Sequence, residues 1–557
     1  MSKLRNVHTE RMITKKRLVI VVSIFVCAYI LLLSNLYTIQ IKKHEYYLGL
    51  ATQYHTRNVR IEPQRGKIYD ANKHVLATDQ TTFIACYPKL PLDQQEFIQQ
   101  SALSTRKASK THQCSEVESW DYAHINHWNN DAIILKTHLT RQYAQGNKLS
   151  HLIGYTSHAS INPLSNEQAS THQSGVNGIE SYYDDQLKGY PGKKVHTINA
   201  SGTIQQTHTL SKSIAGEDIY TTIHSNLQKK AHYLLDGHSG TVIMLNPNTG
   251  AIIAAVSTPS FDPKNPIKSA DYKNSNLLNR ITQATYPPAS TLKPIFSLLA
   301  LEDQHISVQD KIHDPGYYLV GNKRFRDWKR QGHGEVDLNK AINESCDTYF
   351  YMLGHRLGID TLVNYLSLFK FNQATQIDLP NEKNNLIPTA QYRRARSGGW
   401  YDGHTIITAI GQGDLAVTPI SLARATMLLA NKGYDHQLHI NKSNQSIAKT
   451  PTLKVQDKNW EIIHTILSSV TQTGTAKKFA GSSYSVAGKT GSAQVKAIDK
   501  KADYYTLKQY EKDHSLFIGF SPVINPEVAI VTIIEHEPLA VKVSKSMLDY
   551  YWEVTQK

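Results

Sequence analysis

Three short segments of the sequence contain side chains that could carry out acyl transfer. In the first, YPPASTLKP, two prolines precede Ser290 and Lys293, and an apolar stretch with helical spacing follows. This pattern predicts that Ser290 lies at a helix N-terminus, with Lys293 on the same face one turn later. A serine hydroxyl is a poor nucleophile until a base takes its proton, and a lysine sheltered from water can have its pKa lowered enough to do so.

The S-x-x-K spacing alone is weak evidence for catalysis. Three other pairs with this spacing occur in the chain: Ser104–Lys107, Ser367–Lys370 and Ser446–Lys449. Any one such pair is usually a helix-capping serine followed by a solvated lysine. The context of Ser290 must therefore distinguish it from the others.

Two further segments supply that context, in a fixed order along the chain. INESCDTYFYMLG places Ser345 and Asp347 at the head of an aromatic-rich predicted helix. VAGKTGSAQV places Lys489, Thr490 and Gly491 between apolar residues, as in an active-site strand. The set S-x-x-K, S-D-N and K-T-G is the signature of penicillin-binding proteins and class A β-lactamases, and S-C-D stands here for its second member.

A group of residues just before and within the second segment could bind a metal ion. Carboxylate, imidazole and thiolate ligands suit tetrahedral zinc. The alternatives are an aspartate paired with an arginine and a small buried cysteine. The four candidate ligands are Asp314, Asp327, His333 and Cys346.

The N-terminal region contains one uncharged apolar segment, residues 18–41, which is long enough to cross a bilayer. Basic residues dominate residues 1–17, so the positive-inside rule predicts a cytoplasmic N-terminus and export of the remainder. A cleaved signal peptide is the competing interpretation, but residues 34–41 lack a clear small-x-small cleavage site. We therefore predict a retained single-pass anchor.

The remaining chain of this 557-residue protein is predicted to form two exported regions. Residues 216–557 are predicted to form an α/β or α+β domain whose sheet joins strands from both ends, with helical segments between them, and residues 42–215 form the region that precedes it. Cys86 and Cys114 could form a disulfide, although spacing alone does not establish it. The net charge of +15 is interpreted as a dispersed basic surface, with no nucleic-acid partner.

Longer segments resemble a known family, the class B penicillin-binding proteins. STPSFDP, AIGQGDLAVTPISLARA and HSLFIGFSP resemble its transpeptidase domain, which implies an α+β fold for residues 216–557, with an antiparallel sheet flanked by helices and a helical subdomain. RGKIYDANKHVLA and GVNGIESYYDDQLKG resemble its pedestal, which implies an extended α+β, dimerisation-like domain for residues 42–215. The insert at residues 90–146 is unmatched. Asp347 in place of the commoner asparagine, HLIGY and the metal-like cluster are similar to the elongation type, penicillin-binding protein 2.

This resemblance implies a peptidoglycan D,D-transpeptidase that is located in the bacterial inner membrane, faces the periplasm and acts in cell elongation and shape. It implies Ser290 as nucleophile, Lys293 as base, and Ser345 as a proton relay near the positive charge of Lys489. Asp347 would orient the Lys293 side of the site. The substrate-binding residues implied are Thr490, Gly491 and Ser492, the last a position where relatives mostly have threonine.

The resemblance also implies ligands and partners. Stem peptides would be substrates, β-lactams would acylate the serine, and zinc would be structural rather than catalytic. A SEDS-type glycan polymerase and an MreC-type elongation scaffold would be partners through the anchor and pedestal.

Three other functions fit parts of the pattern. One is a division-type transpeptidase. A second is a β-lactamase or D,D-carboxypeptidase, but the EVDLN segment at residues 335–339 precedes Ser345 rather than following it, so we interpret it as a chance match. A third is an inactive scaffold or a β-lactam sensor, for which the short segment before residue 18 leaves little room for cytoplasmic output.

Overall fold

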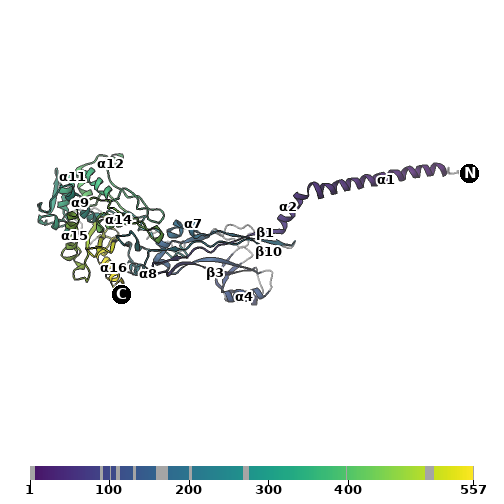
Figure 1. The fold of residues 1–557 in the computed structure, drawn as a ribbon, viewed down its shortest axis with the longest axis horizontal. Coiled ribbons are helices and arrows are strands. Elements are labelled where there is room, and N and C mark those ends of the chain that lie inside the picture. Colours follow the sequence, from purple (N-terminus) through teal and green to yellow (C-terminus); the bar gives the residue numbers. More distant parts are fainter. Residues whose placement is uncertain are drawn as a thin grey trace. The chain divides into compact units, whose positions relative to one another are not determined.

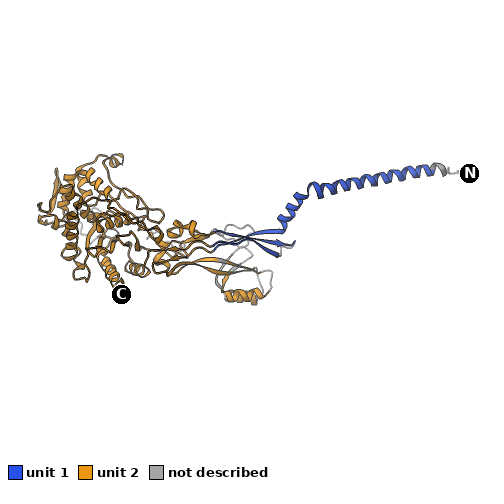
Figure 2. Ribbon diagram, viewed as in Figure 1, with its two compact units in different colours: residues 1–63, 190–214 blue, residues 64–189, 215–557 orange. Residues whose placement is uncertain are grey.

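The computed structural model describes residues 7–87, 92–100, 102–107, 113–128, 133–158, 173–199, 204–266, 275–396, 398–495 and 507–555. Two compact units result, one made of residues 1–63 and 190–214 and the other of residues 64–189 and 215–557 (Figure 2). The domain boundaries given above stay a prediction.

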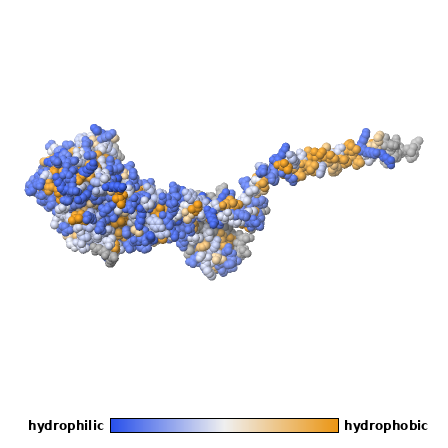
Figure 3. Space-filling model, in the orientation of Figure 1, coloured by the Kyte–Doolittle hydropathy of each residue, from blue (hydrophilic) through white to orange (hydrophobic). Residues whose placement is uncertain are grey.

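The first unit combines a long N-terminal helix with a small sheet. Helix α1 (Val7–Tyr37) continues through a π-helical turn, η1 (Thr38–Lys42), and is followed by α2 (His44–His55). One stretch of 33 residues, Glu10–Lys42, is long and apolar enough to cross a membrane, and its apolar side chains form an exposed band (Figure 3). The predicted anchor at residues 18–41 lies within it. The antiparallel sheet has the order β1-β9-β10, with β1 (Thr56–Ile61), β9 (Gly192–Ile198) and β10 (Ile204–Ser211).

The N-terminal part of the second unit is built on a six-stranded sheet. Its order is β11-β2-β3-β5-β4, with β6 pairing β3 on its other side. Cys86 is disulfide-bonded, and the register of β3 and β5 places Cys114 opposite it; the side chain of Cys114 lies outside the described residues. The strands are β2 (Ile68–Tyr69), β3 (Val75–Tyr87), β4 (Ala102–Lys107), β5 (Gln113–Val117), β6 (Ile134–Tyr143) and β11 (Ile219–Tyr220).

Short elements complete this part of the unit. They are α3 (Leu92–Gln100), α4 (Ser119–His127), η2 (Gly146–Leu149), α5 (Ser150–Ile153), β7 (Thr156–His158), β8 (Gln173–Gly175), α6 (Gly178–Tyr182) and α7 (Asp184–Leu187).

A buried ion network joins two segments that are far apart in the sequence. The guanidinium groups of Arg65 and Arg141 each donate to the carboxylate of Glu180, at 2.6 and 2.7 Å. Asp79 accepts from Arg141 at 3.2 Å and from the backbone N–H of Arg65 at 2.7 Å. Each buried charge therefore has an opposite partner, which buried charges require. This network explains why RGKIYD and GVNGIES are tied together in one domain.

The C-terminal part is organised around a five-stranded antiparallel sheet with the order β13-β12-β20-β19-β18. Helices α8, α14, α15 and α16 lie in the same part of the chain (Figure 1): α8 and α16 contact each other and, respectively, β13 and β20, α14 contacts β12 and β20, and α15 contacts β18. Every residue of β12, β13 and β20 is buried, so both faces of these strands are covered. This double coverage explains why the strands are apolar without alternation. The elements are α8 (Ser225–Leu234), β12 (Gly240–Leu245), β13 (Ile252–Thr258), α14 (Pro419–Ala430), α15 (Asp457–Gln472), β18 (Ala487–Ala493), β19 (His514–Ser521), β20 (Val528–Ile534) and α16 (Ala540–Thr555).

The predicted α+β architecture is confirmed. Strand β12 pairs with both β13 and β20, so the sheet does join the two ends of the domain. Between these ends lie the helical and hairpin elements that carry the candidate site. They are η3 (Ala289–Leu292), α9 (Lys293–Glu302), β14 (Ile312–Asp314), β15 (Tyr317–Val320), β16 (Lys323–Arg326), β17 (Gly334–Val336), α10 (Leu338–Asn343), α11 (Asp347–Leu368), α12 (Ala390–Arg396) and α13 (Asp402–Ala409), and short turns follow at η4 (Lys442–Asn444), η5 (Lys477–Phe479) and η7 (Gln509–Glu511).

Candidate active site and metal cluster

Ser290 lies in a tight turn rather than in a regular helix. It occupies the 3₁₀ turn η3, and α9 begins three residues later at Lys293. The preceding Ala289 has φ +51°, and its N–H donates to the carbonyl of Gly411 at 2.8 Å. A Cβ at Gly411, itself at φ +71°, would lie 2.2 Å from the carbonyl oxygen of Ala289. The backbone around the serine is thus held by a close approach that glycine alone permits.

Lys293 is completely buried beside the second motif. Its Nζ donates to Oδ1 of Asp347 at 2.7 Å and to the carbonyl of Ser345 at 2.9 Å, with the Ser345 hydroxyl at 3.4 Å. The ammonium also lies 5.1 Å from the ring centroid of Phe350. The structure therefore brings Lys293, Ser345 and Asp347 together, as the sequence predicts.

Lys489 also contacts Ser345. Its Nζ donates to Oγ of Ser345 at 3.0 Å and to the carbonyl of Thr490 at 3.1 Å. Burial lowers the pKa of Lys489 well below its ordinary value, and the charge of Lys293 adds to this effect, while Asp347 opposes it. The hydroxyl of Ser345 is thus flanked by two amines, an arrangement suited to passing a proton between them.

Ser345 is held in an uncommon backbone conformation. Its φ is +61°, in the left-handed region, and the next residue, Cys346, forms the N-cap of α11. Such strain persists only where surrounding contacts enforce it, and it is concentrated at functional sites. Here the carbonyl and the hydroxyl of Ser345 are both held by lysines.

The nucleophile lies next to the edge strand that carries the third motif. Strand β18 is the last strand of the sheet and contacts η3. A Cβ at Gly491 would lie 3.1 Å from Cγ2 of Thr291 and 3.3 Å from the carbonyl of Pro288, so the turn and the strand approach closely. Among the described residues, the Ser290 hydroxyl has no hydrogen-bond partner, and its side chain is partly exposed. It is accessible to a substrate.

Sequence reasoning missed two residues that support this strand. The side-chain amide of Gln412 donates to the carbonyl of Ser492 at 2.9 Å, and the hydroxyl groups of Thr475 and Thr490 lie 2.7 Å apart. The GQGD segment contains Gln412 and was noted for its resemblance to the family, which was the available signal. No local pattern marks Thr475. In contrast, Glu335 of EVDLN is exposed and pairs with His313.

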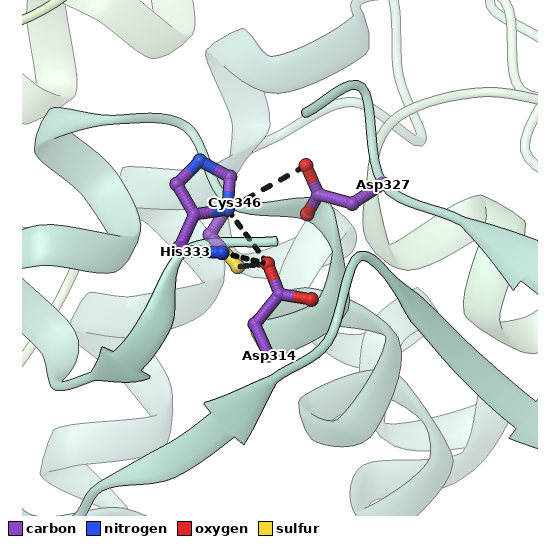
Figure 4. Close-up of side chains that lie close together, drawn as sticks. All are labelled: Asp314, Asp327, His333 and Cys346. Carbon is purple, nitrogen blue, oxygen red and sulfur yellow. Dashed lines mark hydrogen bonds and ion pairs between the residues drawn. The ribbon is translucent and has the colours of Figure 1, made fainter. Parts of the chain in front are cut away.

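The four candidate metal ligands gather in one buried cluster (Figure 4). One ligand atom from each lies within 4.8 Å of all the others. Nδ1 of His333 lies 2.7 Å from Oδ2 of Asp314 and 3.6 Å from Oδ1 of Asp327, and Sγ of Cys346 donates to Oδ2 of Asp314 at 3.5 Å. The side chains come from β14, the segment after β16, the residue before β17 and the N-cap of α11.

The chemistry of this cluster fits a divalent cation. Two buried carboxylates lie together, and in the described part of the chain no lysine or arginine forms an ion pair with either. Burial, and then the neighbouring Asp327, raises the pKa of the Cys346 thiol, an effect that a bound cation would offset. Nε2 of His333 is buried without a hydrogen-bond partner among the described residues, 3.9 Å from Glu344. Nδ1 is therefore the nitrogen that faces the carboxylates.

Comparison with known families gives two matches along the chain. Residues 240–549 match the model of the penicillin binding protein transpeptidase domain. Residues 110–221 match that of the penicillin-binding protein dimerisation domain. The second match includes much of the insert that the sequence analysis left unassigned.

Comparison with individual proteins gives full-length relatives. The chain is 31% identical to the peptidoglycan D,D-transpeptidase MrdA of Acinetobacter baumannii, over 100% of this chain and 90% of the relative. It is 33% identical to MrdA of Escherichia coli K12, over 91% and 88%. Among solved structures, penicillin-binding protein 2 of Helicobacter pylori in complex with MreC has a TM-score of 0.76 at 27% identity, covering 90% of this chain and 99% of that one. Penicillin-binding protein 2 of Pseudomonas aeruginosa in complex with WCK 5153 has a TM-score of 0.65 at 30% identity, covering 88% and 96%.

Proposed function

Because the chain belongs to the penicillin-binding protein 2 family of peptidoglycan D,D-transpeptidases, we propose that it cross-links stem peptides through an acyl intermediate on Ser290. The observation that carries this proposal is the chain of hydrogen bonds from Lys293 through Ser345 to Lys489, next to the turn that presents Ser290. A division-type enzyme and a β-lactamase are not favoured, since the relatives described above are named peptidoglycan D,D-transpeptidase MrdA.

In the acylation step, Lys293 accepts the proton of the Ser290 hydroxyl. The serine oxygen then attacks the carbonyl carbon of the penultimate D-alanine of a stem peptide. The backbone N–H groups of Ser290 and Ser492 stabilise the oxyanion, supported by the close approach of η3 and β18. Such donors are commonly worth about 3 kcal/mol each.

In the same step, the departing D-alanine takes a proton through Ser345, which is hydrogen-bonded to both lysines. Asp347 fixes the position of Lys293, and Thr490 binds the terminal carboxylate of the stem peptide. An amine of a neighbouring stem peptide then attacks the acyl-serine, which restores the hydroxyl and forms the cross-link. β-Lactams acylate the same serine and are released slowly.

The position of the covalent bond tests this proposal. The full-length protein is incubated with benzylpenicillin, digested, and its peptides are examined by tandem mass spectrometry. We expect one adduct, on Ser290, that persists for minutes or longer. An adduct at another residue, no adduct, or release within milliseconds would contradict the proposal.

Exchange of Asp347 for asparagine is expected to move the acid limb of the acylation rate profile to lower pH. Burial and Lys293 lower the pKa of Lys489, and Asp347 opposes both, so removing the carboxylate lowers this pKa further. Lys489 then stays neutral to a more acidic pH, so it can still take up the proton that Lys293 removes from Ser290 and passes on through Ser345. Rates of acylation measured across the acid and neutral range check this, and a limb that moves to higher pH would contradict it.

We also propose that Asp314, Asp327, His333 and Cys346 bind zinc, because their residue types and burial suit this ion. Four protein ligands complete a tetrahedral site, so the ion would be structural. It would supply the positive charge that the two buried carboxylates lack. Since Cys346 adjoins Ser345, the site would hold the start of α11 in place.

The long apolar N-terminal helix fits a membrane anchor, and we infer a cytoplasmic N-terminus with the folded regions in the periplasm. The inferred partners are a SEDS-type glycan polymerase and an MreC-type scaffold. The second is supported by the complex formed by the Helicobacter pylori relative. The cellular role we infer is wall synthesis during elongation.

A further inference from the structure

The hairpin of β15 and β16, with the segment that follows it, concentrates positive charge on the surface. Within residues 323–330, KRFRDWKR, the acidic residue is Asp327, which is buried and turned toward the metal cluster. Lys329 pairs with Glu344 at 3.5 Å. The other four cations are exposed, and none forms an ion pair among the described residues. We call them the cationic rim: Lys323, Arg324, Arg326 and Arg330.

The rim is mounted on a rigid support. Phe325, between Arg324 and Arg326 in β16, packs with Tyr351 and Ile406 in a small apolar core of its own. The hydroxyl of Tyr351 donates to the carbonyl of Arg326 at 3.3 Å. The guanidinium of Arg324 lies 4.7 Å from the ring centroid of Tyr317, a cation–π contact that limits its motion. Side chains held in this way lose less entropy when they bind an anion.

Two residues between the rim cations, Asp327 and Trp328, contact the second motif directly. The indole N–H of Trp328 donates to the carbonyl of Glu344, the residue before Ser345, at 3.2 Å. The N–H of Thr348 donates to Asp327 at 3.0 Å. Trp328 is nevertheless 59% exposed, so a flat apolar surface lies between Arg326 and Arg330 in the sequence and next to the site in space.

We propose that the cationic rim and Trp328 form a binding subsite for the peptidoglycan strand, in which the cations hold carboxylates of its stem peptides. This inference rests on the proposed function, because it takes the polymer that the enzyme cross-links as the occupant. Stem peptides repeat along a strand and end in carboxylates, so a cluster of exposed cations complements them. Trp328 offers a face on which a sugar ring or a peptide plane can pack.

The position of the rim distinguishes this occupant from an anionic lipid surface. A lipid-binding patch would gain nothing from a bond to the residue beside Ser345, whereas a substrate subsite requires such proximity. Exposed charges each contribute little and are screened by salt, so the rim should raise affinity for the polymer by about tenfold and lose this effect at high ionic strength.

The test compares two triple variants of the full-length protein in detergent. R324Q/R326Q/R330Q removes rim charges, and K229Q/K449Q/K454Q removes three exposed charges elsewhere in the same domain. The probes are uncross-linked glycan strands that carry pentapeptides and the same strands with amidated carboxylates. Binding is followed by co-sedimentation at low and high salt, and cross-linking by analysis of the products. The rate of penicillin acylation reports whether Ser290 is still assembled.

We expect the rim variant to bind the carboxylate-bearing strands about tenfold more weakly than the wild-type protein and to lose most of its salt dependence, with cross-linking reduced in parallel. The amidated strands should bind the wild-type protein and the rim variant equally. The K229Q/K449Q/K454Q variant should bind strands and cross-link them like the wild-type protein. Unchanged strand binding in the rim variant would overturn the inference. So would a selective loss of binding to vesicles containing phosphatidylglycerol. If penicillin does not acylate the wild-type protein, the proposed function is overturned instead.

Discussion

Replacing Lys293 with methionine is expected to slow acylation of Ser290 by benzylpenicillin by about 10²–10⁴-fold, the usual contribution of a positioned general base. The variant keeps the serine, the turn that presents it and Lys489, but it removes the amine that contacts Ser345 and Asp347. Stopped-flow or quench measurements of adduct formation give the rate, and S290A gives the background without a nucleophile.

A loss of folding must be separated from this loss of chemistry. Lys293 is fully buried and Asp347 is 15% exposed, so breaking their pair should lower the free energy of unfolding by about 3 kcal/mol. The double variant K293M/D347N removes both charges and should regain stability while it stays slow. K432M removes a lysine that lies 3.8 Å from Asp457 on the surface, and it should acylate like the wild-type protein. If K293M acylated within about threefold of the wild-type rate, a base other than Lys293 would act, because general bases contribute far more than this.

Much of the candidate site could be predicted because its signals are local. The two prolines before Ser290 and the apolar spacing after it indicate where a helix begins, and α9 begins at Lys293. The apolar runs near both ends of the domain predict strands, and β12 and β20 indeed pair. Such patterns depend on neighbouring residues, so a single sequence contains them.

The parts that escaped prediction depend on contacts between distant residues. Ser290 lies in a 3₁₀ turn because Ala289 is held by Gly411, more than a hundred positions away. The left-handed backbone of Ser345 and the contact of Gln412 with Ser492 have the same kind of cause. The prediction of a dispersed basic surface likewise says nothing of where Lys323, Arg324, Arg326 and Arg330 come together; none of them forms an ion pair among the described residues. Contacts between residues that are distant in the sequence cannot be predicted from any one segment.

The second large effect is expected at the metal cluster. The purified protein should contain about one zinc ion per chain by inductively coupled plasma mass spectrometry, because the four buried side chains would complete a closed tetrahedral site around the proposed ion. C346S should lose most of this zinc, since a hydroxyl is a poor replacement for thiolate. Two buried carboxylates would then lack a cation, and unfolding should become easier by about 3 kcal/mol or more.

The link between the cluster and the catalytic centre makes this change more than a loss of stability. Cys346 is the N-cap of α11 and follows Ser345, whose φ of +61° must be maintained by its surroundings. We therefore expect C346S, or removal of zinc by a chelator, to slow acylation by about tenfold even at temperatures where the domain stays folded. C27S removes another free cysteine, in α1, and should leave zinc content and rate unchanged. A C346S protein with full zinc content, or a metal-free wild-type protein with unaltered melting temperature and rate, would exclude a structural zinc ion. A cation that those four side chains bind must stabilise the folded state, and it does so more strongly the more tightly it binds.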